Sequence, residues 1–238
     1  MWRLRHNNFD SNFMTILRIE NLQKHYEIPG AGIQAVLDIE SFELLAAEQV
    51  ALKGGSGCGK STFLNAIAGI TTFEAGSIEV DSIAIQKLTE AQRDQLRGQK
   101  IGYIFQSFHL LPGYTAYENV ILGMSFNGNM NHSLAKDLLV RVGLEDRMLH
   151  TPGQLSVGQR QRVAVARAMA NNPCLVLADE PTANLDTELS LSVIQLIKDL
   201  CKEHNAAMLL VTHDDEILNQ FSTIKNLEII NKAYGAKL

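Results

Sequence analysis

The stretch GGSGCGKS at residues 54–61 places glycines, a lysine and a serine at a spacing suited to binding a polyphosphate. It fits the pattern G-x-x-x-x-G-K-[ST], follows the apolar run EQVAL and opens the helical pattern STFLNAIAG. The glycines are expected to let backbone N–H groups turn inward around phosphate oxygens at the positive end of a helix; they are Gly54, Gly55, Gly57 and Gly59. The alternative is an ordinary glycine-rich turn between a strand and a helix.

The side chains of this loop have separate predicted roles. Lys60 is expected to reach the terminal phosphates and Ser61 to bind Mg²⁺. Two further loop residues, Ser56 and Thr62, complete the predicted nucleotide contacts together with Cys58. Cys58 lies near a helix start, where a thiol pKa can fall; the alternative is that a crowded turn needs a small side chain.

Two adjacent carboxylates end the apolar run CLVLADE at residues 174–180. Asp179 lies where a carboxylate can hold Mg²⁺ through its water shell, and Glu180 can orient, or accept a proton from, a water that attacks a phosphate. Two solvated acids at a strand end are the alternative. Because the pair follows a phosphate loop and a strand of the right type, it indicates hydrolysis of the bound nucleotide.

Composition and charge limit the classes of function. The chain has 238 residues, of which 46% are hydrophobic, and this content suits a folded domain. Its formal charge of −5 argues against nucleic acid as a partner. Its three cysteines are scattered without a CxxC pair, which favours a reducing compartment and so the cytoplasm. No run approaches the about 20 apolar residues that span a bilayer, so a membrane role is expected to come through a partner. Residues 1–13 are polar and aperiodic, and we predict a disordered tail or a misplaced start there.

The elements that must position these residues begin with short β-rich runs. TILRIENLQ, IQAVLDIESFEL, EQVAL, SIEV and IAI are broken at residues 29–32 and 81–82 and predict a small, partly antiparallel sheet. Helical spacing begins near Thr89, which forms a capping-box pattern with Gln92. A second such pattern, T-x-x-E, begins at residue 115, and a helical insert is predicted for roughly residues 107–170.

After the insert the chain is predicted to return to the same sheet. The apolar run CLVLADE reads as a buried parallel strand, and AMLLVTHD reads as another. Between them, apolar residues recur at helical spacing at positions 189, 193, 196, 197 and 200. The order strand, helix, strand predicts a βαβ unit with polar residues at the strand ends, where α/β folds bind ligands.

Four further stretches, taken with the phosphate loop and the two acids, resemble a known family. They are IGYIFQSFHLLP, LSVGQRQRVAVARAMA, PTANLD and LLVTHD. In this order and spacing they resemble the ATP-binding cassette ATPases, from residue 14 onward, and their wording is most similar to the lipoprotein-release and macrolide-export type. The resemblance implies an α/β fold in a single domain over residues 14–238, with a P-loop NTPase core, a mixed sheet, an N-terminal antiparallel β subdomain and the helical insert.

The resemblance also implies a shared site. In the family, the helix start in LSVGQ of one subunit addresses the γ phosphate of ATP held by another, and Ser156, Gly158 and Gln159 match that role here. The helix-start N–H groups and the serine hydroxyl suit a phosphate oxygen. Val157 stands where the family commonly has a second glycine, which is expected to alter affinity or rate. Ser156 and Gln159 also fit a capping box, and both roles can hold in different nucleotide states.

Three more residues take their roles from the resemblance. Gln106 matches the glutamine that touches Mg²⁺ and the attacking water, although alone it would read as a turn residue. His213 matches the histidine that hydrogen-bonds the γ phosphate, although alone it would read as an ordinary core or surface histidine. Tyr26 matches the aromatic residue that stacks on adenine, with core packing as the alternative. Asp186 matches the segment that crosses the dimer interface, although it could equally cap a helix.

The implied function is that of an ATPase that closes as a dimer on two MgATP and drives separate integral membrane permease subunits. It would therefore lie at the cytoplasmic face of the membrane through those partners, in export or lipoprotein extraction. The segment FHLLPGYTAYENV after Gln106 could form a groove for a partner's helix, with burial inside the insert as the alternative. Arg160, Arg162 and Arg167 are expected on a solvated or interfacial helix face. The alternative function is a regulatory cassette that acts on a cell-envelope or division partner without moving cargo.

Overall fold

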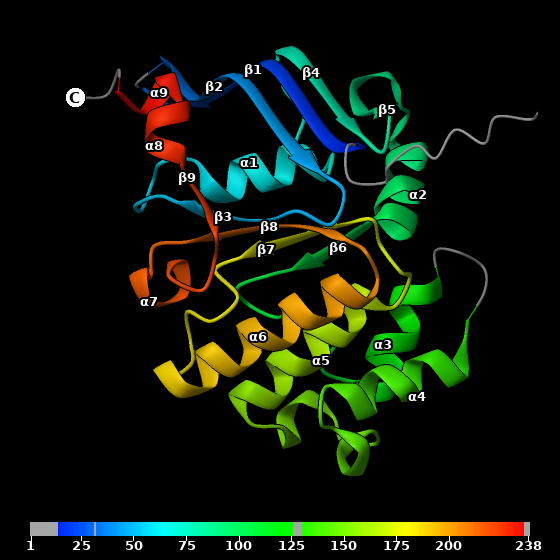
Figure 1. Cartoon of the computed structure of the whole chain (residues 1–238). Coiled ribbons are helices and arrows are strands. Elements are labelled where there is room, and N and C mark those ends of the chain that lie inside the picture. The colour runs from blue at the N-terminus through cyan, green and yellow to red at the C-terminus, as the bar shows by residue number, and fades with distance from the viewer. Residues whose placement is uncertain (1–13, 31, 126–129, 236–238) are drawn as a thin grey trace, which may run out of the picture.

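The computed structural model describes residues 14–30, 32–125 and 130–235, so the tail predicted for residues 1–13 lies outside the described residues. An antiparallel sheet covers one end of the molecule (Figure 1). Its strands are β1 (Thr15–Ile28), β2 (Gly32–Leu45), β4 (Ala75–Val80) and β5 (Ile83–Ala84), in the order β2-β1-β4-β5. The antiparallel sheet predicted for the first third of the chain is therefore confirmed.

A second sheet is parallel throughout and holds the rest of the strands. They are β3 (Gln49–Lys53), β6 (Ile101–Ile104), β7 (Leu175–Asp179), β8 (Ala207–Thr212) and β9 (Thr223–Asn226), in the order β6-β7-β8-β3-β9. Two predictions are wrong here. EQVAL does not belong with the other N-terminal strands, because β3 pairs with β8 and β9. The second half of the chain does not return to the N-terminal sheet, because β7 and β8 join β3 in this second sheet. A run as short and apolar as EQVAL is compatible with either sheet, and only its pairing with strands distant in the sequence determines which sheet it joins.

One hydrophobic core joins the two sheets. The helix α1 (Lys60–Ile67) lies between them (Figure 1), and its Phe63 and Leu64 pack with Leu17 of β1 and Leu177 of β7. Residues of β7 alternate between this core and a second one on the opposite face, which contains Val176. Both faces of β7 are therefore buried, as its continuous apolar run predicts.

The second core lies among helices on the other face of the parallel sheet. They are α3 (Ala116–Met124), α4 (His132–Arg141), α5 (Val157–Met169) and α6 (Thr187–Glu203). α3 to α5 fall within the region predicted as a helical insert, and α6 connects β7 to β8 as the predicted βαβ unit requires. On α6, Val193, Ile197 and Leu200 form the buried stripe that the sequence spacing predicts.

The remaining helices are short, apart from α2 (Glu90–Lys100). Thr89 and Gln92 form the predicted capping box at the start of α2, and Thr115 and Glu118 form the one at the start of α3. The short helices α7 (Asp215–Leu218), α8 (Leu227–Ile230) and α9 (Lys232–Gly235) follow β8 and β9, and single 3-10 turns lie at Ile85–Lys87, Glu145–Arg147 and Pro152–Gln154. Among the described residues, no helix combines the length and apolar character needed to cross a bilayer.

Candidate functional site

A cavity of about 670 Å³ lies where four parallel strands end. The phosphate loop follows β3, Gln106 follows β6, Glu180 follows β7 and His213 follows β8, so the cavity occupies the carboxyl edge of the sheet. The residues that line it are Tyr26, Val36, Gly55, Ser56, Gly57, Gly59, Lys60, Ser61, Thr62, Gln106, Glu180 and His213. Most of the predicted site residues therefore meet in one place.

The phosphate loop has the backbone shape that its glycines allow. Gly57 and Gly59 have φ values of 77° and 97°, in the left-handed region that glycine adopts without strain. Gly54 and Cys58 do not line the cavity but pack against each other, because a Cβ on Gly54 would lie 2.5 Å from the Cys58 Sγ. Burial raises the pKa of the Cys58 thiol, so the idea of a lowered pKa is wrong and the small-side-chain interpretation holds.

Lys60 lies at the centre of the hydrogen-bond network. Its Nζ donates to the carbonyl oxygens of Gly54 and Gly55, at 2.9 Å each, and lies 3.0 Å from Glu180 Oε1. The residue is only 8% exposed. The ammonium group is thus held at the mouth of the loop by two carbonyls and one carboxylate, and a phosphate that enters the cavity would meet it there.

Glu180 links Lys60 to the predicted histidine. Its Oε2 lies 3.1 Å from His213 Nδ1. Burial raises the pKa of the Glu180 carboxyl, but the hydrogen bonds from Lys60 and His213 outweigh that effect, and the pKa lies below its ordinary value. The backbone of Glu180 has φ of 42°, a strained value for a residue with a side chain, and strain of this kind is common at functional sites. The carboxylate is therefore ionised and held in place next to the cavity.

Asp179 differs from its neighbour in its surroundings. It is 8% exposed at the end of β7 and does not line the cavity itself. Burial raises the pKa of Asp179, and a hydrogen bond with the Ser61 side chain opposes this rise. Ser61 and Gln106 both line the cavity, and the hydrogen bond links Asp179 to Ser61. The three predicted Mg²⁺ ligands offer a hydroxyl, an amide and a carboxylate, which are oxygen donors that suit this ion.

Tyr26 of β1 also lines the cavity. The residue is 42% exposed, so the alternative of core packing is wrong. The Lys24 ammonium lies 5.0 Å from the centre of the tyrosine ring, and the same ammonium pairs with Glu74 at 2.8 Å. This cation–π contact orients the ring, which leaves an exposed aromatic surface beside the phosphate loop.

The helix start in LSVGQ does not belong to the cavity of its own chain, since Ser156, Gly158 and Gln159 are not among the residues that line it. Ser156 caps α5 and forms the predicted capping box with Gln159. Gly158 is buried, and a Cβ there would lie 2.5 Å from Leu189 Cδ2 of α6. Asp186 accepts a hydrogen bond from the Leu189 N–H, so its capping role is confirmed.

Three residues at the site have no signal in the sequence. Val36 of β2 lines the cavity beside Tyr26. Glu228 of α8 and Asn231, between α8 and α9, hydrogen-bond the phosphate loop at Gly55 and Cys58. Neither of these polar residues belongs to a recognisable motif, and only the folding of the distant C-terminal segment brings them to the loop.

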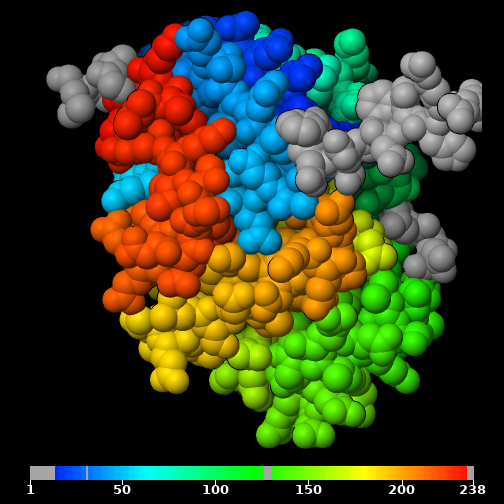
Figure 2. Space-filling view, viewed as in Figure 1, coloured from blue at the N-terminus to red at the C-terminus, as the bar shows by residue number. Residues whose placement is uncertain are grey.

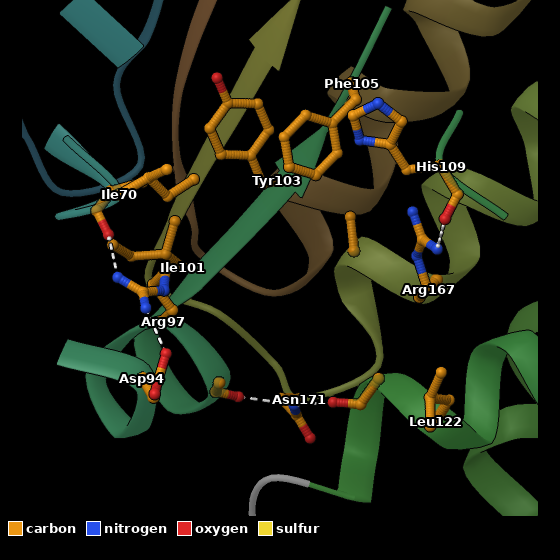
Figure 3. A pocket seen from close by; sticks show the side chains of 14 residues that line it. Ile70, Asp94, Arg97, Ile101, Tyr103, Phe105, His109, Leu122, Arg167 and Asn171 are labelled. Atoms are coloured by element: carbon orange, nitrogen blue, oxygen red, sulfur yellow. Dashed lines mark hydrogen bonds and ion pairs between the residues drawn. The ribbon is translucent and has the colours of Figure 1, made fainter. Parts of the chain in front are cut away.

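A second cavity, of about 350 Å³, lies between α2, the edge strand β6, α3 and α5. Figure 3 shows Tyr103, Phe105 and His109 along one wall; the first two rings stack with their centres 4.0 Å apart. Arg167 donates to the carbonyl oxygens of Phe108 and His109 at 2.7 Å and 2.5 Å. The expectation of a solvated face is wrong for Arg167, because these loop carbonyls hold its guanidinium and burial lowers its pKa; the interfacial alternative stays a prediction. We call this cavity, with its exposed neighbour Ile70, the α2–α5 groove.

Comparisons with known proteins agree with this geometry. Residues 37–183 match the family model described as ABC transporter. Over 228 residues, covering 92% of this chain and 98% of the relative, the chain is 41% identical to the lipoprotein-releasing system ATP-binding protein LolD of Idiomarina loihiensis. It is also similar to the dimeric post-hydrolysis structure of the ATP-binding cassette MJ0796 bound to ADP and Pi, with a TM-score of 0.82, 36% identity and coverage of 92% of this chain and 95% of the other. A second dimeric structure of that cassette gives a TM-score of 0.81 and 37% identity, with coverage of 88% and 93%.

Proposed function

Because this chain belongs to the ABC transporter family, we propose that it is the ATP-hydrolysing subunit of a transporter that extracts lipoproteins from a membrane. The observation that carries the ATPase activity is the convergence of Lys60, Glu180 and His213 on one cavity beside the phosphate loop. The similarity to a lipoprotein-releasing protein over nearly the whole of both chains supports the cargo class.

The roles of the site residues follow from their positions. The loop N–H groups and Lys60 hold the phosphates, and the ionised Glu180 orients the attacking water and accepts its proton. Ser61, Gln106 and Asp179 would hold Mg²⁺, and the ion would supply positive charge to offset that of the phosphates. Tyr26 stacks on adenine with its exposed ring, and His213 donates to the γ phosphate. Lys60 must exchange its bond with Glu180 for the phosphates, which leaves the carboxylate free for the water.

The working unit in this proposal is a dimer of two copies of the chain. Ser156 and Gln159 do not line the cavity of their own chain, yet Ser156 is exposed and its hydroxyl can still donate. A second copy can therefore supply this helix start to the phosphates, and both structural relatives are dimeric. Each copy would hold one nucleotide and complete the site of the other.

The membrane partner is proposed to bind at the α2–α5 groove. The groove combines stacked aromatic rings with the exposed apolar Ile70, a surface that suits an amphipathic helix. The groove adjoins the phosphate-loop helix α1, because the hydroxyl of its lining residue Tyr103 donates to Asn65 Oδ1 at 3.1 Å. It also adjoins the segment after Gln106, because His109 lines it. Closure of the dimer would then move the helices of the insert, residues 107–170, against the partner at the cytoplasmic face of the membrane.

Cargo release tests the proposal most directly. The full chain would be purified with the membrane proteins that copurify with it, reconstituted in liposomes with a fluorescent triacylated lipoprotein, and given MgATP. We expect ATP-dependent release of the lipoprotein to a soluble acceptor. Hydrolysis by the same complex without release of cargo would overturn the extraction function and favour the regulatory alternative.

A matched pair of variants tests the partner site. Ile70→Arg places a charge in the α2–α5 groove, whereas Leu149→Arg places one at an equally apolar position that is 79% exposed and outside the groove. We expect Ile70→Arg to lose copurification with the membrane subunits while its basal ATPase activity persists. Leu149→Arg should keep both the copurification and the basal activity. Equal copurification of the two variants would exclude the groove as the docking site.

A further inference from the structure

The C-terminal helices α8 and α9 lie against the strands of the N-terminal third of the chain. Figures 1 and 2 show this segment, in red, beside the blue and cyan strands near the phosphate loop. Two residues of the segment hydrogen-bond that loop through their side chains, Glu228 of α8 and Asn231 between the helices. Neither residue lines the nucleotide cavity, so both act on it from outside.

Asn231 is 1% exposed and uses both ends of its amide. Its Nδ2 donates to the carbonyl oxygen of Cys58 in the phosphate loop at 3.0 Å and to that of Val36 in β2 at 2.9 Å. Its Oδ1 accepts from the Asp38 N–H at 2.8 Å. One side chain thus ties the phosphate loop to the strand that lines the cavity beside Tyr26.

Glu228 holds the loop at a second point. Its Oε1 accepts a hydrogen bond from the Gly55 N–H at 2.8 Å, and a Cβ on Gly55 would lie only 2.9 Å from that oxygen. The Asn226 side chain accepts from the Glu228 N–H at 2.8 Å and fixes the start of α8. Gly55 is therefore held in a place that a larger residue could occupy only if the carboxylate moved.

These contacts have a consequence for ligand binding, and we propose that Asn231 and Glu228 are positioning residues that keep the phosphate loop in its anion-binding shape. The inference rests on the proposed function. A loop that must present several N–H groups to phosphates has to be fixed before the ligand arrives, because ordering it on binding would reduce the affinity. Asn231 also fixes the span between the phosphate subsite and the strand pair that carries Tyr26.

Three substitutions and a control test this role in the full chain. Glu228→Ala removes the acceptor for the Gly55 N–H, whereas Glu228→Gln keeps an oxygen that can accept. Asn231→Asp keeps the bond from Asp38 but loses both donated bonds, including the one to Cys58. Lys232→Ala is the control, because it breaks a surface ion pair with Glu40 of β2, at 2.7 Å, without touching the loop.

The measurement is the Kd of mant-ADP, a fluorescent nucleotide, at a temperature well below thermal unfolding. We expect Glu228→Ala to raise the Kd by about tenfold, as the loss of one hydrogen bond implies, and Asn231→Asp, which loses two, to raise it by about tenfold or more. Glu228→Gln and Lys232→Ala should stay near the wild-type Kd. In steady-state turnover, the KM for ATP should rise more than kcat falls.

The outcomes separate the inference from the function on which it rests. If the wild-type protein does not bind mant-ADP, both the positioning role and the proposed function are overturned. Wild-type binding with an unchanged Kd in Glu228→Ala and Asn231→Asp, even with a lower melting temperature, overturns the positioning role alone and makes the two residues purely structural. If Asn231→Asp does not fold, the contrast between Glu228→Ala and Glu228→Gln decides, since Glu228 is only partly buried.

Discussion

Lys60 of the phosphate loop and Glu180 at the end of β7 form a largely buried ion pair with 3.0 Å between Nζ and Oε1. The lysine that is proposed to hold the phosphates and the carboxylate that is proposed to act on water are thus each other's counter-ion. Removal of either partner leaves a buried charge without its match, which is costly. Variants that keep the shape of the pair are therefore needed to separate nucleotide binding from turnover.

Glu180→Gln is the variant that best separates these steps. The amide keeps an oxygen for Lys60 but loses the basicity needed to accept a proton from water. We expect kcat to fall by about a hundredfold or more while nucleotide binding remains. Size-exclusion chromatography with MgATP should show a dimer that persists, because hydrolysis no longer opens it. A variant that elutes only as a monomer under these conditions would argue against the dimer.

Lys60→Ala should abolish nucleotide binding, because it removes the ammonium group that the Gly54 and Gly55 carbonyls hold at the mouth of the cavity. The control is Lys53→Ala at the end of β3, which breaks an exposed ion pair with Asp215 instead. Titration with mant-ATP measures the Kd of both variants. We expect no saturable binding by Lys60→Ala and an unchanged Kd for Lys53→Ala. Wild-type affinity in Lys60→Ala would overturn the assignment of the phosphate site.

Ser156→Asp separates the two roles of the serine. Aspartate caps a helix about as well as serine does, so α5 and the melting temperature should be preserved. A carboxylate pointed at the phosphates of a second copy would repel them, so steady-state ATPase activity should be lost while binding of mant-ATP to the monomer persists. In the wild type, turnover per chain should rise with protein concentration. Full activity in Ser156→Asp would mean that capping is the only role of Ser156.

The extent to which the sequence predicts this molecule depends on how local each signal is. The capping box of Thr115 and Glu118 involves residues three apart, and the helix α3 begins where this sequence pattern predicts. The burial of Leu177 in β7 follows from a continuous apolar run, which is also local. By contrast, β3 was predicted in the wrong sheet, because strand pairing is a matter of distant partners.

The same distinction applies to the site. Glu180 and His213 lie at the ends of apolar strands, so their meeting follows from parallel strands that share one edge. Asn231 reaches Cys58 across 173 positions and belongs to no motif. The charge of Arg167 suggests a solvated face, but the loop carbonyls that hold its guanidinium become its partners only once α5 has packed.

Glu74→Gln should lower stability at neutral pH but not in acid. Burial raises the pKa of Glu74, but bonds from the Lys24 ammonium and the His25 N–H outweigh this and hold it below its ordinary value of 4.5. A carboxyl whose pKa is lowered by folding adds stability above its unfolded pKa, and that stability is lost as the pH falls through the folded value. Thermal unfolding of wild type and variant should therefore differ at pH 7 and converge at a pH below that folded value. Glu43→Gln is the control: it removes an exposed pair with Arg18 and should have little effect at either pH. A difference between wild type and Glu74→Gln that persists unchanged in acid would show that the charge of Glu74 is not what stabilises the fold.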